Sequence, residues 1–435
     1  MITYGCFYIL WVFSPSVAIK RRRIRDEHAL GESAMPDFGT GMMVVDIEGA
    51  GISLPGAPIS TETMLDSLED HVSADLRNSV RNMGIKDRYS VIADYPGYVS
   101  GRSQRAFDSS TTSLAAAAVE ACLDDWGGDP SQVGLVIAIT NTANRPLPCL
   151  VYELVALFQG RLSDDVSVVN LQNMGCSSLI KAAEIAGMFI ARHPDKTALV
   201  VAVEATTGLV ETLKADRYRS FREILASRGD GTMADDMRNM QRFLFAMLFG
   251  DAAVAFVLGA SEGAGRLGFG PTMHATNLEA TDTEILRMDE GGIQVPVPEG
   301  FPFYIMGDEV PRRGSAYVSE LLSRLRSRYR SENGELTNRP PRDLFQFFNI
   351  HTGSKKILSK VFSQLQVDEA GPQAGESFGV LSRYANTSCC SVGLMLAERC
   401  KAPLRDEVGL VVTFGVGFSA SAAIVGTHWN GAQWH

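Results

Sequence analysis

Residues 166–191, VSVVNLQNMGCSSLIKAAEIAGMFIA, decide the fold of this chain, because a β-branched apolar run meets a short turn and then a helix of small residues. The run at residues 166–171 predicts a buried strand, and the apolar residues beyond the turn occupy nearly every side of the predicted helix. We therefore expect this helix to lie in the middle of the molecule.

Cys176 stands at the corner between the predicted strand and helix. A thiol at the first turn of a buried helix faces the positive end of the helix dipole and unpaired amide hydrogens, which stabilise the thiolate and lower the thiol pKa. A cysteine in that place can act as a nucleophile. The alternative is that Cys176 only fills space, as most free cysteines do. The choice between a nucleophile and a space-filling cysteine depends on the rest of the chain.

The composition is that of a globular protein. The chain has 435 residues, of which 45% are hydrophobic and 21% are charged, enough for two or three cores. Its formal net charge of -10 argues against nucleic acid as a partner. The seven cysteines, at positions 6, 122, 149, 176, 389, 390 and 400, form no CxxC pair, so neither a zinc site nor a disulfide framework is indicated. We expect a reducing compartment, the cytoplasm.

The N-terminus contains an apolar stretch whose charges are placed unlike those of a signal peptide. Residues 2–19 are largely apolar, and arginines follow at positions 21, 22, 23 and 25. A secretory signal carries its positive charge first, and a membrane span needs about 20 apolar residues. Residues 1–40 are therefore either a weak membrane anchor, with its arginines on the cytoplasmic side, or a tail upstream of the true start at Met35, Met42 or Met43. We favour the second interpretation.

Two parts of the chain resemble each other. Residues 173–178, NMGCSS, and residues 386–391, NTSCCS, each open a helix of small apolar residues, and they lie 386 - 173 = 213 residues apart. A duplicated βαβα unit, with halves at residues 41–262 and 263–430, places these helices back to back with their N-termini at one cavity. The expected fold class is α/β. Buried strands are predicted at residues 133–139, 197–204, 249–258, 345–350, 409–414 and 419–425.

Residues 210–240 interrupt this pattern. They are charged and helical in pattern, with a break at residues 227–231, so they look like an excursion from the sheet. They are either a solvated helical pair without chemistry or a lid or partner-docking element.

Of the seven histidines, His351 is the one best placed for chemistry. It follows the strand predicted at residues 345–350, and sites in α/β sheets form at the carboxyl ends of strands. By the repeat, Asn386 faces the same cavity. His274 is predicted to lie in a loop, at the surface or with its ring nitrogens already bonded.

Cys176, His351 and Asn386 together supply one thiol and two hydrogen-bond donors. We find no acidic residue at comparable positions in the sequence, and a Cys-His-Asp hydrolase needs a carboxylate to orient its histidine. Two neutral donors that face a thiolate instead suit the stabilisation of an enolate or an oxyanion.

Three motifs carry a resemblance to a known family: NLQNMGCSS at residues 170–178, NIHTG at residues 349–353 and RYANTS at residues 383–388. With these motifs in this order, the chain from about residue 43 to residue 426 resembles the thiolase-superfamily condensing enzymes. It is most similar to type III polyketide synthases of the chalcone-synthase kind, with features of 3-ketoacyl-CoA synthases and ketoacyl-acyl-carrier-protein synthase III. The resemblance implies a thiolase fold, whose two halves form a five-layer αβαβα sandwich, and a catalytic role for Cys176, His351 and Asn386.

The resemblance also implies a substrate pocket. Phe249 in LFGD and Phe303 in PFYIMGDEVP resemble the two phenylalanines that gate the family's pocket. Leu147 resembles the residue that reaches into the partner subunit's cavity, which implies a homodimer. The other positions implied to bind substrate are Thr206, Leu209, Gly353 and Ser388.

The basic cluster that binds CoA phosphates in the family is only partly present. Arg77 and Arg81 lie near its expected place, while the strict positions are not basic, so an acyl carrier protein could replace CoA as the donor. The resemblance implies acyl and malonyl thioesters as substrates, without a metal or a redox cofactor.

The implied activity is the decarboxylative Claisen condensation of an acyl thioester with a malonyl thioester, which gives a 3-oxoacyl or polyketide product of the pyrone or resorcinol type. One alternative is an acyltransferase of the same fold that makes an ester or an amide without decarboxylation. Another is a catalytically silent subunit that binds acyl chains or a second synthase, although the complete set of cysteine, histidine and asparagine argues against it.

Overall fold

The computed structural model describes residues 45–227, 233–261, 264–288, 304–306, 309–333, 340–402 and 407–428. The chain divides into two units, Met1–Gly41 and Met42–His435, and every described residue belongs to the second. The predicted tail at residues 1–40 lies outside the described residues. Among the helices that the structure describes, none is long and apolar enough to cross a membrane.

Five strands form the part of the sheet that carries the nucleophile segment: β1 (Val45–Ser53), β7 (Ala252–Ala260), β6 (Thr197–Glu204), β4 (Val133–Thr140) and β5 (Ser167–Gln172), in this spatial order. β4 pairs in parallel with β5 and β6, whereas β7 runs antiparallel to β6 and β1. β6, TALVVAVE, is buried along its whole length, as expected of a strand that is covered on both faces.

Four further strands belong to the second half: β11 (Phe347–Ile350), β12 (Val408–Gly415), β13 (Ser419–His428) and β8 (Ala264–Thr276), again in spatial order. β8 meets β1 over two residue pairs, Val45 with Phe269 and Asp46 with Gly268. Hydrogen bonds therefore join both groups into one sheet of nine strands. The strands predicted at six places in the sequence are all present, with their ends shifted by a few residues. The strand predicted at residues 166–171 is also present as β5, but the prediction that it is buried is wrong: β5 is half-buried or exposed along its length, because it lies at the edge of the described sheet.

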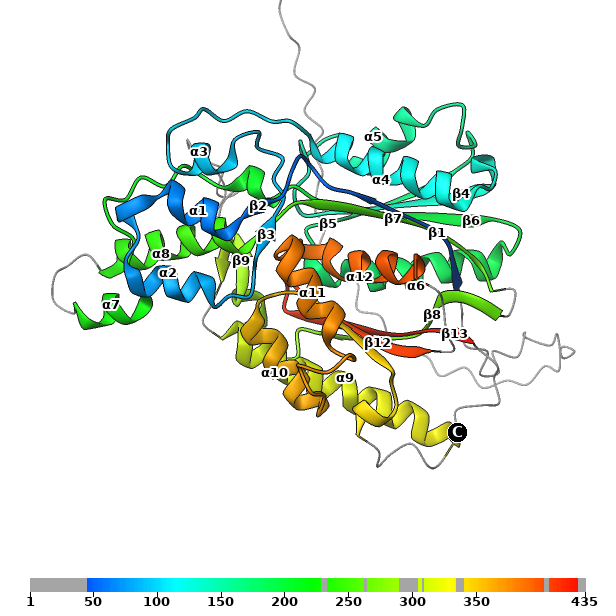
Figure 1. Ribbon diagram of the computed structural model, residues 1–435. Helices are drawn as coiled ribbons and strands as arrows, with labels where there is room; N and C mark the ends of the chain where they lie inside the picture. Colours follow the sequence, from blue (N-terminus) through cyan, green and yellow to red (C-terminus); the bar gives the residue numbers. More distant parts are fainter. Residues whose placement is uncertain are drawn as a thin grey trace, which may run out of the picture. The chain divides into compact units, whose positions relative to one another are not determined.

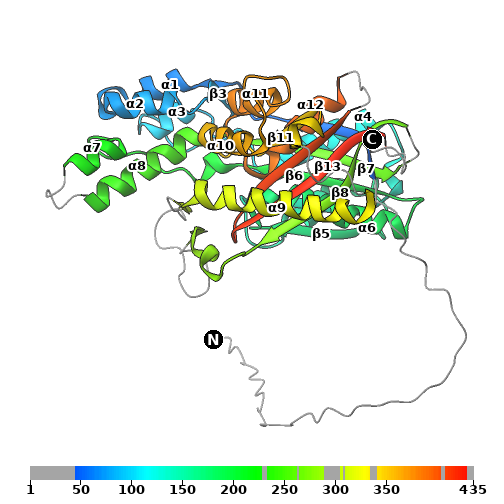
Figure 2. The ribbon, with the colours of Figure 1, turned by 90° about the horizontal axis from the view of Figure 1, so that it is seen from below.

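Helices complete five layers around these strands, which confirms the expected αβαβα sandwich (Figure 1). The outer helices of the first half are α4 (Thr111–Trp126) and α5 (Leu150–Leu157), the central pair is α6 (Ser178–Arg192) and α12 (Ser391–Cys400), and the outer helices of the second half are α9 (Val310–Asn333) and α10 (Lys355–Leu365). Figure 2 shows α9 lying across β8 and β13. Clusters of buried apolar side chains fill the spaces between the layers.

The two central helices pack closely because they are built from small residues. α6 buries Ala182, Ala183 and Ala186, and α12 presents Gly393 to both α6 and the sheet. A β-carbon on Gly393 would lie 2.5 Å from Cγ1 of Val254 and 3.3 Å from Cδ2 of Leu179. The back-to-back placement predicted from the repeat therefore depends on a glycine at this contact.

The excursion at residues 210–240 includes α7 (Phe221–Ala226) and the first part of α8 (Met233–Leu248). α8 buries Phe243, Phe245 and Met247 in a fourth apolar cluster beside the sandwich, which also contains side chains of α1 (Thr61–Ser67), α2 (Ala74–Arg81) and α3 (Tyr95–Val99). Within residues 210–240 most of α8 is exposed or half-buried and only Met240 is buried, so both interpretations of this segment, a solvated helical pair or a lid or partner-docking element, stay open. The apolar cluster covers the later turns of α8. The helix needs this cover because one of its faces is apolar.

The placement of His274 in a loop is also wrong. His274 lies in β8, opposite Ser421 of β13, and its two ring nitrogens meet the side chains of Ser421 and Glu184 at 2.8 Å each. The sequence around it read as a loop because of Gly270 and Pro271. The register of β8 against β13 shifts at that point, which is where a strand tolerates a proline.

The packing at Gly393 predicts the effect of adding one methyl group there. Gly393→Ala should lower the stability by about 1–3 kcal/mol through overpacking. Gly375→Ala is the matched control, because Gly375 also lies in a helix, α11 (Gly375–Tyr384), and its β-carbon would meet nothing within 4 Å. The melting temperature measures both; a Gly393→Ala protein as stable as the control would contradict the packing.

Candidate active site

Cys176 lies in the 3-10 turn η3 (Gly175–Ser177), directly before α6. The backbone of the preceding residue is fixed from two sides. The amide of Gly175 donates to Oδ1 of Asn141 at 2.9 Å, and a β-carbon on Gly175 would collide with the backbone nitrogen of Val416. Gly175 also has a φ of 70°, so the turn that presents the thiol requires a glycine.

Ser388 connects the nucleophile to the second half of the chain. Its Oγ lies 3.3 Å from Sγ of Cys176, and its backbone amide donates to Oδ1 of Asn386 at 2.9 Å. Asn386 is held in turn by backbone bonds to the end of α8: its amide donates to Leu248 at 3.0 Å, and its carbonyl accepts from Gly250 at 3.1 Å. The N-terminal turns of α6 and α12 therefore meet, as the repeat predicted.

His351 follows β11, and its backbone amide donates to the carbonyl of Val412 at 2.9 Å. The side chain is buried, and burial lowers the pKa of the imidazole to about 4, so the ring is neutral at pH 7. Its Nδ1 has no hydrogen-bond partner among the described residues. Nδ2 of Asn386 donates to the carbonyl of Gly353 at 3.4 Å, two residues beyond His351. A continuous series of contacts thus runs from Cys176 through Ser388 and Asn386 to the turn that carries His351.

The expectation of a site without an acidic residue is wrong. Glu204, at the carboxyl end of β6, is fully buried beside the thiol. Its carboxylate accepts from Nδ2 of Asn141 at 2.5 Å, Oγ of Ser388 at 3.0 Å and Sγ of Cys389 at 3.0 Å. Burial raises the pKa of Glu204, and these neutral donors oppose that rise. The strand-end rule that selected His351 would also have selected Glu204.

The expected low pKa of the Cys176 thiol is wrong for the resting site. Burial raises the pKa of the thiol to about 12; the Ser388 hydrogen bond lowers it in part, and the charge of Glu204 raises it further. The helix dipole is a smaller effect, because a few tenths of a charge near the N-terminus do not offset the loss of hydration. The resting cysteine is therefore a thiol, and its proton must leave during attack.

The other positions implied to bind substrate lie in different places. The backbone of Phe249 forms a bridge with Asn386, so this phenylalanine adjoins the site. Thr206 and Leu209 are in η4 (Thr206–Leu209), which begins two residues after Glu204. Leu147 lies apart, 78% exposed. Phe303 lies outside the described residues.

The two arginines expected to bind CoA phosphates already have partners. Arg81 donates to both carboxylate oxygens of Glu62, at 2.9 and 2.8 Å, and this contact lowers the pKa of Glu62. Arg77 donates to the backbone carbonyls of Glu69 and Val72. A phosphate at α2 would have to displace these partners.

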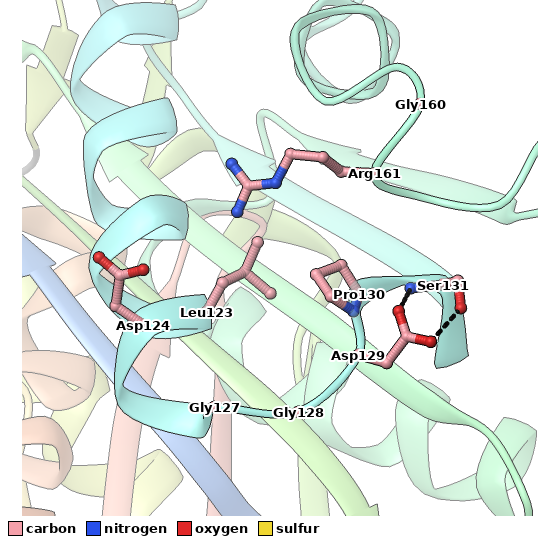
Figure 3. A pocket seen from close by; sticks show the side chains of 9 residues that line it. All are labelled: Leu123, Asp124, Gly127, Gly128, Asp129, Pro130, Ser131, Gly160 and Arg161. Atoms are coloured by element: carbon pink, nitrogen blue, oxygen red, sulfur yellow. Dashed lines mark hydrogen bonds between the residues drawn. The ribbon is translucent and has the colours of Figure 1, made fainter.

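A depression of about 520 Å³ opens between the end of α4 and the turn after α5 (Figure 3). None of the residues that line it is a candidate site residue. Two of its charged side chains are already bonded: Arg161 donates to both carboxylate oxygens of Glu120 at 2.7 Å, and the carboxylate of Asp129 accepts from Ser131. This depression therefore contains neither the cysteine nor the histidine and asparagine of the candidate site.

The proximity of Glu204 to the thiol predicts how Cys176 reacts. Glu204→Gln removes the charge while keeping the shape, so the thiol pKa should fall and alkylation by iodoacetamide at pH 8 should become faster, by about tenfold for each unit of pKa. The rate is followed by mass spectrometry of the Cys176 peptide. Glu120→Gln, at the surface, is the matched control and should leave the rate unchanged. Equal rates in both variants would contradict the influence assigned to Glu204.

The chain is similar in sequence to several known proteins. Residues 68–211 match the family model described as FAE1/Type III polyketide synthase-like protein. The chain is 24% identical over 390 residues to probable polyketide synthase 1 of Dictyostelium discoideum; the match covers 85% of this chain and only 11% of that much longer protein. It is 25% identical to phloroglucinol synthase of Pseudomonas fluorescens, covering 86% of this chain and 96% of that enzyme. It is also 24% identical to β-ketoacyl-[acyl-carrier-protein] synthase III of Caulobacter vibrioides, covering 87% and 98%.

Solved structures show the same fold. The C-terminal type III polyketide synthase domain of Steely1 from Dictyostelium superposes with a TM-score of 0.69 at 19% identity, over 88% of this chain and 99% of that domain. CsyB complexed with CoA-SH superposes with a TM-score of 0.65 at 19% identity, over 88% of this chain and all of that one. The resemblance inferred from the sequence motifs is confirmed: the chain has the thiolase fold of the type III polyketide synthases, and its sequence is similar to these enzymes and to ketoacyl-acyl-carrier-protein synthase III.

Proposed function

We propose that the protein catalyses the decarboxylative Claisen condensation of an acyl thioester with a malonyl thioester, giving a 3-oxoacyl or polyketide product. The contact between Cys176 and Ser388 carries this proposal, since it brings the nucleophile to the segment that holds Asn386. The activities named for the similar proteins, phloroglucinol synthesis and ketoacyl synthesis, support it.

In the first half-reaction, Sγ of Cys176 attacks the carbonyl carbon of the acyl thioester, and the carrier's sulfur leaves. Because the resting cysteine is protonated, its proton must be taken up during the attack and passed to the leaving thiol. The neutral imidazole of His351 is the base that we propose for this step.

In the second half-reaction, the malonyl thioester loses carbon dioxide, and the electron pair of the broken carbon-carbon bond forms an enolate. The side chains of His351 and Asn386 donate hydrogen bonds to the enolate oxygen, each worth about 3–4 kcal/mol in a dry site. The enolate carbon then attacks the acyl carbonyl, and Sγ of Cys176 leaves as the thiolate, which takes up a proton to return to the resting thiol. Both donors are neutral, so the site can stabilise the enolate without a buried positive charge.

The substrates are thioesters of CoA or of an acyl carrier protein, and the proposed chemistry uses neither a metal nor a redox cofactor. Phe249, Thr206 and Leu209 would line the acyl pocket from the ends of α8 and β6. Arg77 and Arg81 would meet the CoA phosphates only by exchanging their present partners, which favours a carrier protein as one of the donors. A reducing compartment such as the cytoplasm would keep the Cys176 thiol free.

We further propose a homodimer formed at the edge strand β5. Within the described residues β5 pairs only with β4, which leaves its other edge open. Leu147, Tyr152 and Leu157, on and just before the adjacent α5, are exposed by 78%, 58% and 61%. The loop before Leu147 is held by an ion pair between Arg145 and Glu153 at 2.6 Å, so the leucine is presented on an ordered support. In the dimer Leu147 would enter the partner's pocket.

The activity is tested by mass spectrometry of the products formed from malonyl-CoA and a panel of acyl-CoAs. The wild-type protein should make a pyrone, a resorcinol or a 3-oxo acid. His351→Gln and Asn386→Ala should each lower the rate by about 10²–10³, because each removes one donor to the enolate. Cys176→Ala should abolish product formation.

Two results would overturn this function. Transfer of the acyl group to an alcohol or amine without release of carbon dioxide would identify an acyltransferase. Unchanged activity in Cys176→Ala would show that the reaction does not need this nucleophile, and a wild-type protein that binds acyl chains but forms no product would be a silent subunit.

The dimer is tested by sedimentation velocity at micromolar concentration. Leu147→Asp should shift the protein towards monomers, since removing a leucine from an apolar contact costs about 2–3 kcal/mol per subunit and the charge adds to this. Phe221→Asp is the control, because Phe221 is similarly exposed but lies on α7, away from β5. A wild-type protein that sediments as a monomer at every concentration would contradict the proposal.

A further inference from the structure

A buried ion pair joins the segment after β8 to the beginning of α9. Nε and Nη2 of Arg313 donate to the two carboxylate oxygens of Asp282 at 2.8 and 2.6 Å, and Nη1 donates to Glu279 at 2.6 Å. Both Arg313 and Asp282 are almost completely buried. We name these contacts, together with Tyr317, the Arg313 clasp.

Tyr317 lies one helical turn after Arg313 and completes the clasp. Its hydroxyl donates to Asp282 at 2.6 Å and accepts from the backbone amide of Leu278 at 2.8 Å. Burial would raise the pKa of Asp282, but the bonds from Arg313 and Tyr317 outweigh it and keep the carboxyl ionised. A buried ion pair of this kind does not by itself show that the fold is stabilised. Replacing such a pair by apolar residues of similar volume often leaves a protein equally stable or more stable. Stability alone therefore does not explain the Arg313 clasp.

The clasp reaches the nucleophile turn through one aromatic side chain. The ring of Phe418 packs edge-on against Tyr317 with the centroids 5.1 Å apart, and the carbonyl of Phe418 accepts from the amide of Asn277 at 2.9 Å. Phe418 ends the short connection between β12 and β13, and Val416 of that connection is the residue that abuts Gly175. At the start of β13, Oγ of Ser419 lies 3.0 Å from Oγ of Ser177. The residues on both sides of Cys176 thus touch the connection that the clasp holds.

We propose that Arg313 is a positioning residue: the Arg313 clasp fixes the connection between β12 and β13, and this connection sets the position of the Cys176 turn. The effect on condensation rests on the proposed function, whereas the effect on the thiol does not. Arg313 itself touches neither Cys176 nor a substrate. A guanidinium suits this role because its planar fork binds a carboxylate in one orientation only.

The test compares variants of the clasp with a control under conditions where circular dichroism shows each to be folded. Arg313→Gln breaks the fork, and Tyr317→Phe removes only the hydroxyl while keeping the ring against Phe418. Arg312→Gln is the matched control, since Arg312 is the neighbouring arginine and is 66% exposed with a surface partner, Glu309. Two quantities are measured: the rate of Cys176 alkylation by iodoacetamide, and kcat and KM for condensation.

Arg313→Gln should change the alkylation rate and lower kcat by about 10-fold to 100-fold, which is the cost of a misplacement of about 1 Å, with KM nearly unchanged. Tyr317→Phe should change the alkylation rate and kcat in the same direction by a smaller factor. If Arg313→Gln does not fold, the comparison of Tyr317→Phe with Arg312→Gln tests the proposal. Arg313→Lys should recover only part of kcat, because it restores the charge without the fork. Alkylation rates and kcat values equal to those of Arg312→Gln in both clasp variants would overturn the proposal. If the wild-type protein makes no condensation product but the alkylation rates differ as stated, the positioning role of the Arg313 clasp is supported and the proposed function is contradicted.

Discussion

The contact between the turns that precede α6 and α12 is the constraint on which the rest of the structure depends. Cys176 and Ser388 belong to different halves of the chain, and their side chains meet at 3.3 Å only if the two central helices begin at the same point. Small residues make this possible, since Gly393 lets α12 approach α6 and Gly175 lets the nucleophile turn approach the connection between β12 and β13. The outer layers of helices then cover the sheet on both sides and exclude water from this point.

Burial also sets the electrostatics of the site. A thiol, an imidazole and a carboxyl group are enclosed together, and each is shifted towards its neutral form: the pKa of Cys176 and of Glu204 is raised, and the pKa of His351 is lowered. At pH 7 the thiol and the imidazole are therefore uncharged at rest. Charge that develops on a substrate oxygen would therefore meet neutral donors in a medium of low dielectric constant, where such hydrogen bonds are strongest.

The sequence predicted most of the strands, and it selected Cys176, His351 and Asn386 as candidate site residues, because these features leave local signals. Continuous β-branched runs identify buried strands, and the matching openings of α6 and α12 identify the repeat. β8 was missed because Gly270 and Pro271 interrupt its pattern, while its pairing with β13 decides its structure. Glu204 was missed because it has no histidine partner, and the raised thiol pKa was missed because burial depends on all the layers at once. The Arg313 clasp joins residues about 30 positions apart and leaves no periodic signal.

A single-turnover chase shows whether Cys176 carries the acyl group through a decarboxylative condensation. The protein is acylated with an acyl-CoA, freed from excess reagent and then mixed with malonyl-CoA, while the mass of the Cys176 peptide and the released carbon dioxide are measured. We expect the acyl group to sit on Cys176, to persist without malonyl-CoA, and to leave when malonyl-CoA is added, with one carbon dioxide released for each acyl group lost. An acyl group on another residue, or its loss without release of carbon dioxide, would contradict a condensation through Cys176.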